Sequence, residues 1–192
     1  MEILFLDDAV KKGLKKIVIF KQIEKLEKKF FPEYPYNFKD IKNAYQKSNG
    51  NTLLLFDKNK IVGYLIPILF KNKDYLQILT IAIDKNHQKK GYGTKLIKKC
   101  EEIAKTFKLK RIIIRADVSY PILKTLKNLK YLPMQLEDIK EFMEEGLFSS
   151  NDIIKIISNA KIRNLFPNAC IITKDIGKKN PYSFIPMIKN LD

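Results

Sequence analysis

The sequence predicts an α/β fold of the α+β type, in which a mixed, mostly antiparallel central sheet carries helices on both faces and a helical segment is inserted late in the chain. Three observations predict this class. Apolar runs at 52–56, 61–70 and 75–84 follow one another across short polar turns, as antiparallel strands do. Residues 93–107 repeat apolar side chains at helical spacing. Residues 111–115 contain consecutive isoleucines, which is typical of a strand buried on both faces.

The first part of the chain mixes strand and helix signals. Residues 2–6 alternate toward strand character, and the acidic pair Asp7-Asp8 suits the start of a short helix. Residues 16–20 form a β-branched run, which favours a strand, whereas the apolar residues after it recur at helical spacing. A helix is therefore predicted over at least 21–30, and Phe31-Pro32 marks its end.

An aromatic loop and a second helix follow. Residues 31–40 combine aromatic rings with two prolines, which favours an ordered loop over a floppy linker. Residues 38–47 place Phe38, Ile41 and Tyr45 on one side and predict a short helix.

The middle of the chain carries the clearest pattern. The polar residues 57–60 between the first two apolar runs predict a hairpin, and the third run adds an antiparallel strand. In the helix 93–107 the apolar stripe includes Cys100, which is expected to pack in the core. Strand, helix and the strand 111–115 together predict a parallel βαβ unit.

The last third is predicted from weaker signals. The expected elements, in chain order, are a helix at about 121–129, a strand at 131–136, helices at 137–145 and 151–163, and a strand at 169–176. The helices from 137 to 163 are interpreted as an insertion, and residues 177–192 as a short C-terminal tail.

Length and composition predict a single domain over residues 1–192. The chain is 45% hydrophobic and 30% charged with few glycines and prolines, as folded soluble proteins are. Its formal net charge of +16 attracts nucleic acid, acidic membranes, acidic proteins or a phosphorylated cofactor. Because lysines are scattered through every segment, compositional bias explains much of this charge, and the charge alone identifies no partner.

The sequence argues against a metal site and a membrane segment. Cys100 and Cys170 lie far apart, and His87 is the only histidine, so no zinc-ligand spacing exists. No apolar run approaches the ~20 residues of a membrane-spanning helix, and the N-terminus lacks the pattern of a signal peptide. We therefore expect no metal, no membrane association and a cytoplasmic location.

A glycine-bearing turn leads into the helix 93–107. The segment 88–94 reads Gln-Lys-Lys-Gly-Tyr-Gly-Thr. A helix N-terminus has unpaired N–H groups, glycines allow close approach to a phosphate, and the lysines add positive charge. Leu96 stands where a dinucleotide fingerprint needs a third glycine, and neither glycine precedes Lys-Ser or Lys-Thr as in a P-loop.

This turn resembles the pyrophosphate loop of the GNAT superfamily of N-acetyltransferases, Arg/Gln-x-x-Gly-x-Gly/Ala, at Gln88, Gly91 and Gly93. The preceding residues 80–83 resemble the family's fourth strand, and the predicted elements follow its layout from about 15 to 176. The resemblance implies acetyl-CoA as cosubstrate. The residues that it implies for cofactor binding are Ile81, Ala82, Ile83, Gln88, Lys89, Lys90, Gly91, Tyr92, Gly93 and Thr94.

The catalytic residues of this family are harder to identify in the present sequence. The family's tyrosine acid follows an Asn-x-x-Ala-x-x-x-Tyr pattern, but its tyrosine slot here holds Leu126 or, in a shifted register, Thr125. Tyr120 lies close in sequence and is a candidate acid. Where related enzymes carry a glutamate or tyrosine base, this chain has Gln77, which is able to hold a water.

The resemblance favours a primary amine of a protein or peptide as acceptor. The loop Phe31–Tyr36 resembles the acceptor groove of protein N-terminal and ribosomal-protein acetyltransferases, which makes Glu33, Tyr34 and Tyr36 candidate substrate-binding residues. Without a strong base, an α-amine of pKa ~7.8 is neutral more often than a lysine of pKa ~10.4.

Two alternatives stay open: a catalytically weak CoA-binding module that docks on RNA or an acidic partner, and acetylation of a small amine or an RNA base. The sequence leaves the oligomeric state undetermined.

Overall fold

The computed structural model describes residues 1–117, 122–144, 153–156, 165–166, 169–174 and 182–191. The chain divides into two compact units. The first comprises residues 1–112 and the C-terminal Leu191, and the second comprises residues 113–190. A single domain over residues 1–192 stays a prediction.

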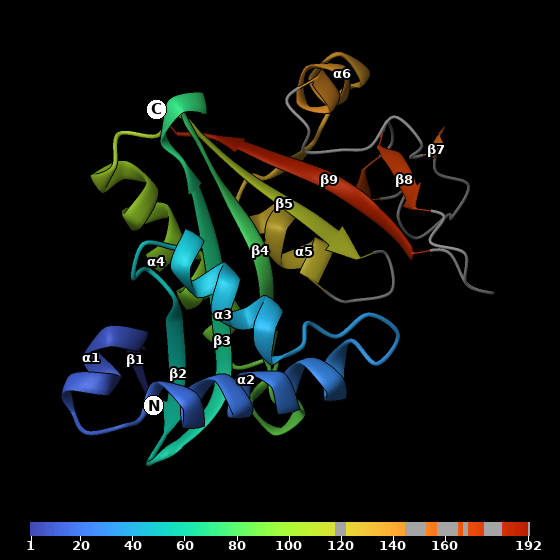
Figure 1. Cartoon of the computed structure of the whole chain (residues 1–192). Helices are drawn as coiled ribbons and strands as arrows, with labels where there is room; N and C mark the ends of the chain where they lie inside the picture. Colours follow the sequence, from blue (N-terminus) through green and yellow to red (C-terminus); the bar gives the residue numbers. More distant parts are fainter. Residues whose placement is uncertain (118–121, 145–152, 157–164, 167–168, 175–181, 192) are drawn as a thin grey trace. The chain divides into compact units, whose positions relative to one another are not determined.

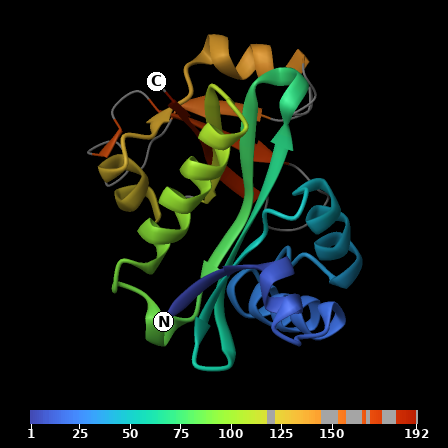
Figure 2. The same cartoon turned by 90° about the vertical axis from the view of Figure 1, so that its left-hand side faces the viewer.

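The first unit is an antiparallel sheet between two helical layers. Its strands β1 (Glu2–Phe5), β2 (Leu53–Asp57), β3 (Lys60–Phe70) and β4 (Tyr75–Ile83) lie in chain order. Helices α2 (Lys16–Phe30) and α3 (Phe38–Lys47) pack on one face, and α4 (Tyr92–Thr106) packs on the other, as Figure 1 and Figure 2 show from two directions. The short helices α1 (Leu6–Lys11), η1 (Lys71–Lys73) and η2 (Lys85–His87) complete the unit.

Helix α2 begins at Lys16, so the reading of 16–20 as a strand-like run is wrong. Ile19 and Ile23 are fully buried, whereas Ile17 and Val18 are exposed, which is the burial pattern of an amphipathic helix. Packing of this apolar stripe on the sheet outweighs the β preference of the branched side chains.

The predicted helices α3 and α4 are confirmed within one residue. Asn37 caps α3 because its side chain accepts the backbone N–H groups of Lys39 and Asp40, while Asp40 accepts the N–H of Asn37. In α4 the predicted stripe is buried against the sheet, and Cys100 lies fully inside it. The expectation that Cys100 packs in the core is therefore confirmed.

A β-bulge interrupts the pairing of β3 with β4. Ile66 pairs with Thr80 and Pro67 pairs with Ile78, so Leu79 is an extra residue on β4. Pro67 has no N–H to give to a regular ladder, and a bulge is one of the few places where a strand accepts proline. The bulge turns β4 locally just before Thr80 and the segment 81–83.

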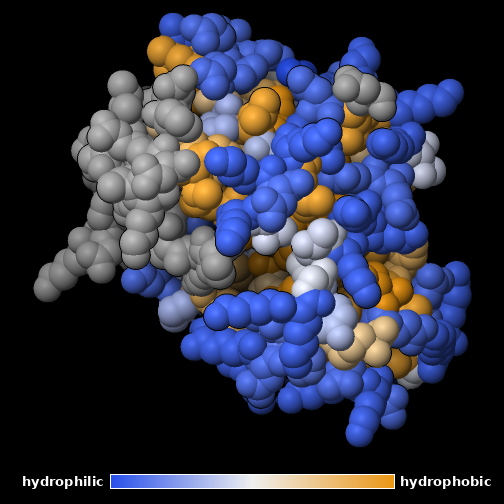
Figure 3. Space-filling view, turned by 180° about the vertical axis from the view of Figure 1, so that it is seen from behind, coloured by the Kyte–Doolittle hydropathy of each residue, from blue (hydrophilic) through white to orange (hydrophobic). Residues whose placement is uncertain are grey.

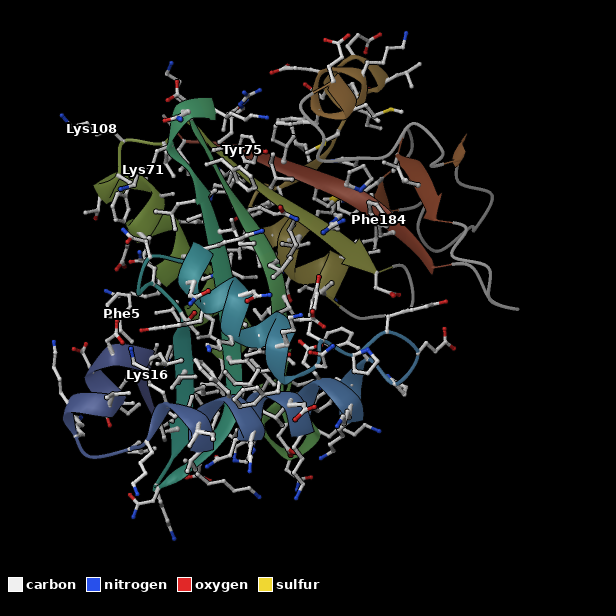
Figure 4. The ribbon with its side chains drawn as sticks, viewed as in Figure 1. Phe5, Lys16, Lys71, Tyr75, Lys108 and Phe184 are labelled. Carbon is white, nitrogen blue, oxygen red and sulfur yellow. The ribbon has the colours of Figure 1, made fainter. Side chains whose placement is uncertain are left out.

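The start of α2 is tied to α1 and α3 by a small polar cluster. Lys16 Nζ lies 2.6 Å from the Tyr45 hydroxyl and 3.1 Å from Asp7 Oδ1, and the Tyr45 hydroxyl donates to Asp7 at 2.5 Å. Figure 4 shows Lys16 beside α1. The hydrogen bond from Tyr45 lowers the pKa of Asp7, so the cluster holds a carboxylate at neutral pH.

The second unit contains most of β5 (Arg111–Asp117), with the order β5, β9, β8 and β7 in its sheet. Isoleucines 112–114 are buried, as predicted for this strand. The other elements, in chain order, are α5 (Ile122–Asn128), β6 (Leu132–Pro133), α6 (Leu136–Glu144), β7 (Ile153–Ile156), β8 (Cys170–Lys174) and β9 (Tyr182–Asn190).

Three predictions for this part differ from the structure. The predicted strand 131–136 is reduced to Leu132–Pro133, and the predicted helix 151–163 contains the strand β7, which pairs antiparallel with β8. The expected tail 177–192 contains β9, which pairs with β8 and with β6. Pairing with partners far along the chain determines these strands, and local sequence patterns do not encode it.

Hydrophilic side chains cover most of the face shown in Figure 3. This agrees with the scattering of lysines along the sequence. None of the helices in the described ranges has both the length and the apolarity to cross a membrane.

Candidate functional site

The turn before α4 has an unusual backbone conformation at two positions. Lys89 has φ 60° and Gly91, the N-cap of α4, has φ 79° and ψ 0°, both in the left-handed region. The first helical hydrogen bond runs from Lys95 N to Gly91 O at 3.0 Å. The preceding N–H groups of the first turn therefore have no partner within the helix, and they point toward any anion placed at its end.

Gln88 and Gly93 fix this turn against the end of β4. The side-chain amide of Gln88 donates to the carbonyl oxygen of Ile83 at 2.8 Å. A β-carbon at Gly93 would lie 3.6 Å from Ile83 Cδ1, so α4 begins in ordinary contact with the last residue of β4. The sequence-predicted residues Ile83, Gln88 and Gly93 are thus brought together.

The turn is electropositive and open to solvent. Lys89, Lys90 and Gly91 are exposed, and the first turn of α4 contains no acidic residue. Lys90 Nζ donates to the carbonyl of Asn86 at 2.8 Å, and Lys95 Nζ lies 5.7 Å from the centre of the Tyr92 ring. With the helix dipole, these lysines favour a negatively charged ligand.

Consecutive residues at the end of strand β4 lie on opposite faces of the sheet. Ile81 and Ile83 are partly exposed on the face that α4 covers, whereas Ala82 is buried among the residues of α2 and α3. The alternation follows from the two-residue period of a strand.

The segment between β4 and the turn is held by charged contacts. Asp84 accepts the N–H of Asn86, and its carboxylate lies 2.6 Å from Lys29 Nζ. The Lys29 contact lowers the pKa of Asp84. His87 Nε2 lies 3.0 Å from Asp57 Oδ2 at the β2–β3 turn. His87 therefore anchors the segment that leads into the turn.

The candidate substrate-binding residues of the aromatic loop differ in their exposure to solvent. Glu33 is exposed, and Tyr34 and Tyr36 are half-buried. Tyr34 N donates to Phe31 O at 3.1 Å, and Tyr36 packs on the core beneath α2 and α3. The loop is therefore ordered by its own backbone and by packing, as its aromatic and proline content predicts.

A buried glutamate that the sequence analysis missed lies under this loop. Glu27 is only 1% exposed. Its Oε1 accepts the hydroxyl of Tyr64 on β3 and that of Thr80 on β4, the latter at 2.7 Å. Its Oε2 accepts the backbone N–H of Tyr36 at 3.2 Å. The available signal was its spacing, because Glu27 lies four residues after Ile23 and three before Phe30 on the apolar stripe of α2.

Burial controls the electrostatics of this cluster. It raises the pKa of Glu27 above its usual value, and the hydrogen bonds from Tyr64 and Thr80 act in the opposite direction. Burial and the neighbouring Glu27 also raise the pKa of Tyr64, which keeps its hydroxyl protonated as the donor. The cluster thus joins a carboxylate to neutral donors.

The two catalytic candidates stand differently. Gln77 is 3% exposed, and its amide nitrogen has no partner among the described residues. Gln77 pairs with Ile68 of β3, and Thr80 pairs with Ile66 of β3. Because Ile66 and Ile68 are two residues apart and so share one face, Gln77 and Thr80 lie on that same face of the sheet. Tyr120 lies outside the described residues. Among those residues no group of three or more His, Cys, Asp and Glu side chains is arranged to hold a metal ion.

Comparison with known proteins gives one family match. The model of the acetyltransferase (GNAT) family matches residues 20–122, a span that includes the turn 88–94. No curated protein matches the chain in sequence.

Several solved structures share the fold. The ribosomal-protein alanine N-acetyltransferase from Escherichia coli has a TM-score of 0.62 at 12% identity, over 98% of this chain and 92% of that one. Ard1 from Thermoplasma volcanium has a TM-score of 0.59 at 9% identity, over 90% and 93%. An aminoglycoside 6'-N-acetyltransferase complexed with coenzyme A has a TM-score of 0.56 at 13% identity, over 99% and 97%. These likenesses confirm the predicted mixed α/β fold class.

Proposed function

Since the chain belongs to the acetyltransferase (GNAT) family, we propose that it transfers the acetyl group of acetyl-CoA to a primary amine of a protein or peptide. The observation that carries the proposal is the turn 88–94. Its left-handed backbone at Gly91, its free helical N–H groups and its exposed lysines form a site suited to a pyrophosphate. A fold neighbour with coenzyme A in its structure supports the same cosubstrate.

The remaining cofactor contacts follow from the course of β4. With the pyrophosphate at the turn, the pantetheine arm extends along the partly exposed side of Ile81 and Ile83, and backbone groups there bind its amides. Gln88 supports this arrangement because it holds the carbonyl of Ile83 in place. Lys89, Lys90, Tyr92 and Thr94 complete the proposed cofactor site at the start of α4.

The proposed reaction is direct transfer. The lone pair of a neutral amine attacks the thioester carbonyl carbon, the C–S bond breaks, and the amine proton is lost while the thiolate of CoA gains one. A backbone N–H near Ile83 stabilises the oxyanion. Gln77 orients a water that removes the amine proton, since its own amide has no basic group, and Tyr120 is the proposed proton donor to the thiolate.

A protein or peptide acceptor is favoured by the loop 31–37. Tyr34 and Tyr36 offer half-buried rings, and Glu33 offers an exposed carboxylate that suits a cationic amine. Fold neighbours named for a ribosomal-protein alanine and for an aminoglycoside show that the fold accepts both large and small acceptors. The ordered aromatic loop is the reason for preferring a peptide.

Cofactor binding is tested with Gly91→Ala and the matched control Gly13→Ala. Both glycines are exposed, have positive φ and have open space where a β-carbon would stand. Each substitution therefore costs a similar ~1–2 kcal/mol of backbone strain. In isothermal titration we expect Gly91→Ala to weaken acetyl-CoA binding at least about tenfold, because the N–H groups shift, and Gly13→Ala to bind as the wild type. Equal affinities of the two variants for acetyl-CoA would argue against the turn 88–94 as the cofactor site.

Transfer is tested by CoA release with a panel of peptides that present free α-amines or lysines. We expect turnover with at least one peptide and a mass increase of one acetyl group on its amine. If acetyl-CoA binds but neither peptides nor small amines are acetylated, the chain is a CoA-binding module, and salt-sensitive RNA retention would then be the next measurement.

A further inference from the structure

Resting on the proposed function, we propose that Glu27 is a positioning residue for the acceptor. Its carboxylate joins the loop 31–37 to strands β3 and β4 beside the bulge at Leu79, and so determines how an acceptor amine lies against β4.

The geometry places three elements on one carboxyl group. Oε2 holds the backbone of the loop through Tyr36 N, and Oε1 holds the sheet through the hydroxyls of Tyr64 and Thr80. Thr80 is the first paired residue after the bulge, directly before the proposed cofactor segment 81–83. The loop that would receive the acceptor and the strand that would carry the thioester thus share a single anchor.

The anchor has no cationic partner among the residues that the structure describes. Every contact of Glu27 in the described part of the chain comes from a neutral donor, and the nearby lysines of α2 pair elsewhere, Lys28 with Glu24 and Lys29 with Asp84. A buried carboxylate without a counter-ion favours a positive charge in its surroundings. An amine arrives largely as its ammonium, so the same residue that fixes the loop also favours the approach of a cationic acceptor.

Simple stabilisation does not require a carboxylate here. Glu27 lies on the apolar stripe of α2 between Ile23 and Phe30, where an apolar residue of similar volume would pack well and avoid the desolvation of a charge. An apolar residue would, however, remove the acceptor of the Tyr36 N–H and leave the buried Tyr64 hydroxyl only its 3.3 Å contact with the Thr80 hydroxyl. What the carboxylate supplies is a defined position of the loop relative to β4.

The first test compares Thr80→Val with Thr52→Val. Both threonines are buried and hydrogen-bond a second polar side chain, Thr80 to Glu27 and Thr52 to Ser48. Both substitutions remove a hydroxyl with little change in shape, but only Thr80→Val touches the Glu27 cluster. We expect Thr80→Val to raise the KM for the acceptor peptide about threefold to tenfold at unchanged Kd for acetyl-CoA. Thr52→Val should leave both constants within about twofold of the wild type.

The second test uses Glu27→Gln. The carboxamide oxygen still accepts from Tyr64 and Thr80, but its NH2 group then faces the N–H of Tyr36, so the loop bond is lost. Hydrogen exchange should become at least about tenfold faster at the Tyr36 amide and unchanged in α4. The acceptor KM should rise at least as much as in Thr80→Val.

The outcomes separate the inference from the function that it rests on. If the wild type acetylates no amine, the proposed function is wrong and the inference falls with it. If the wild type is active and the two threonine variants have equal KM values, Glu27 has no role toward the acceptor. Faster exchange at Tyr36 with an unchanged KM in Glu27→Gln also overturns the inference, because it makes the contact structural only.

Discussion

Gly63 is a position where one added methyl group has a cost that the structure specifies. Gly63 lies in β3 between Leu55 of β2 and Ile83 of β4. A β-carbon there would lie 2.9 Å from the backbone oxygen of Ala82, 3.2 Å from Ile83 Cγ1 and 3.3 Å from Leu55 Cδ2. The oxygen belongs to a hydrogen-bonded strand and cannot rotate away, so Gly63→Ala must push β3 and β4 apart.

The magnitude follows from two opposing effects. Overpacking of this kind costs about 1–3 kcal/mol. Replacing a strand glycine by alanine returns about 0.5–1 kcal/mol, because the unfolded chain loses conformational freedom. The net loss is therefore about 0–2.5 kcal/mol with a central value of ~1 kcal/mol. This central value corresponds to a decrease in Tm of about 2–4 °C for a chain of this size.

The assay is thermal unfolding of Gly63→Ala beside Gly93→Ala. A β-carbon at Gly93 contacts the same Ile83, but at an ordinary 3.6 Å, and it meets no backbone atom. Alanine in this first turn of α4 should leave the free energy of unfolding unchanged or raise it by up to about 1 kcal/mol. The Tm of Gly93→Ala should therefore equal or exceed that of the wild type. Equal Tm values for the two variants, or a lower Tm for Gly93→Ala, would refute the reasoning from close approach.

Two further predictions concern buried titratable groups. Burial raises the pKa of the Cys100 thiol. We therefore expect iodoacetamide at pH 8 to leave Cys100 unmodified in the folded protein and to modify it in urea, as measured by peptide mass spectrometry. Rapid labelling of the folded protein would contradict this. Because burial raises the pKa of Glu27 above 4.5, its contribution to stability is present below pH 4.5 and is lost as pH rises through the folded pKa. The free energy of unfolding of the wild type should therefore fall relative to Glu27→Gln as pH rises above about 4.5, measured by urea titration at a series of pH values, and a constant difference would contradict this.

The first unit was predictable because its elements follow local rules. Polar turns separate apolar runs in β2, β3 and β4, and α4 shows a continuous stripe. The exception is the start of α2, where residues 16–20 are β-branched but pack at helical spacing. In the second unit β7 and β9 depend on pairing with β8, and only the fold supplies that partner.

The candidate site divides in the same way. The turn 88–94 has a local signature of glycines before a helix, and the structure has the left-handed N-cap at Gly91 that such a signature implies. The Glu27 cluster joins α2, β3 and β4 across 37 and 53 positions of sequence, so no motif contains it. Pro67 inside an apolar strand was a readable sign of the bulge, since proline is rare in a regular ladder.

The left-handed backbone at Lys89 has a consequence for the kinetics of binding. A non-glycine residue in this conformation costs about 1–2 kcal/mol, and the fold maintains it before any ligand arrives. The entropy loss of shaping the turn has thus already occurred during folding, and an anion meets a turn that already has this shape. Association with such a turn needs no slow rearrangement, so differences in affinity among anionic ligands at this turn should reside in their dissociation rates.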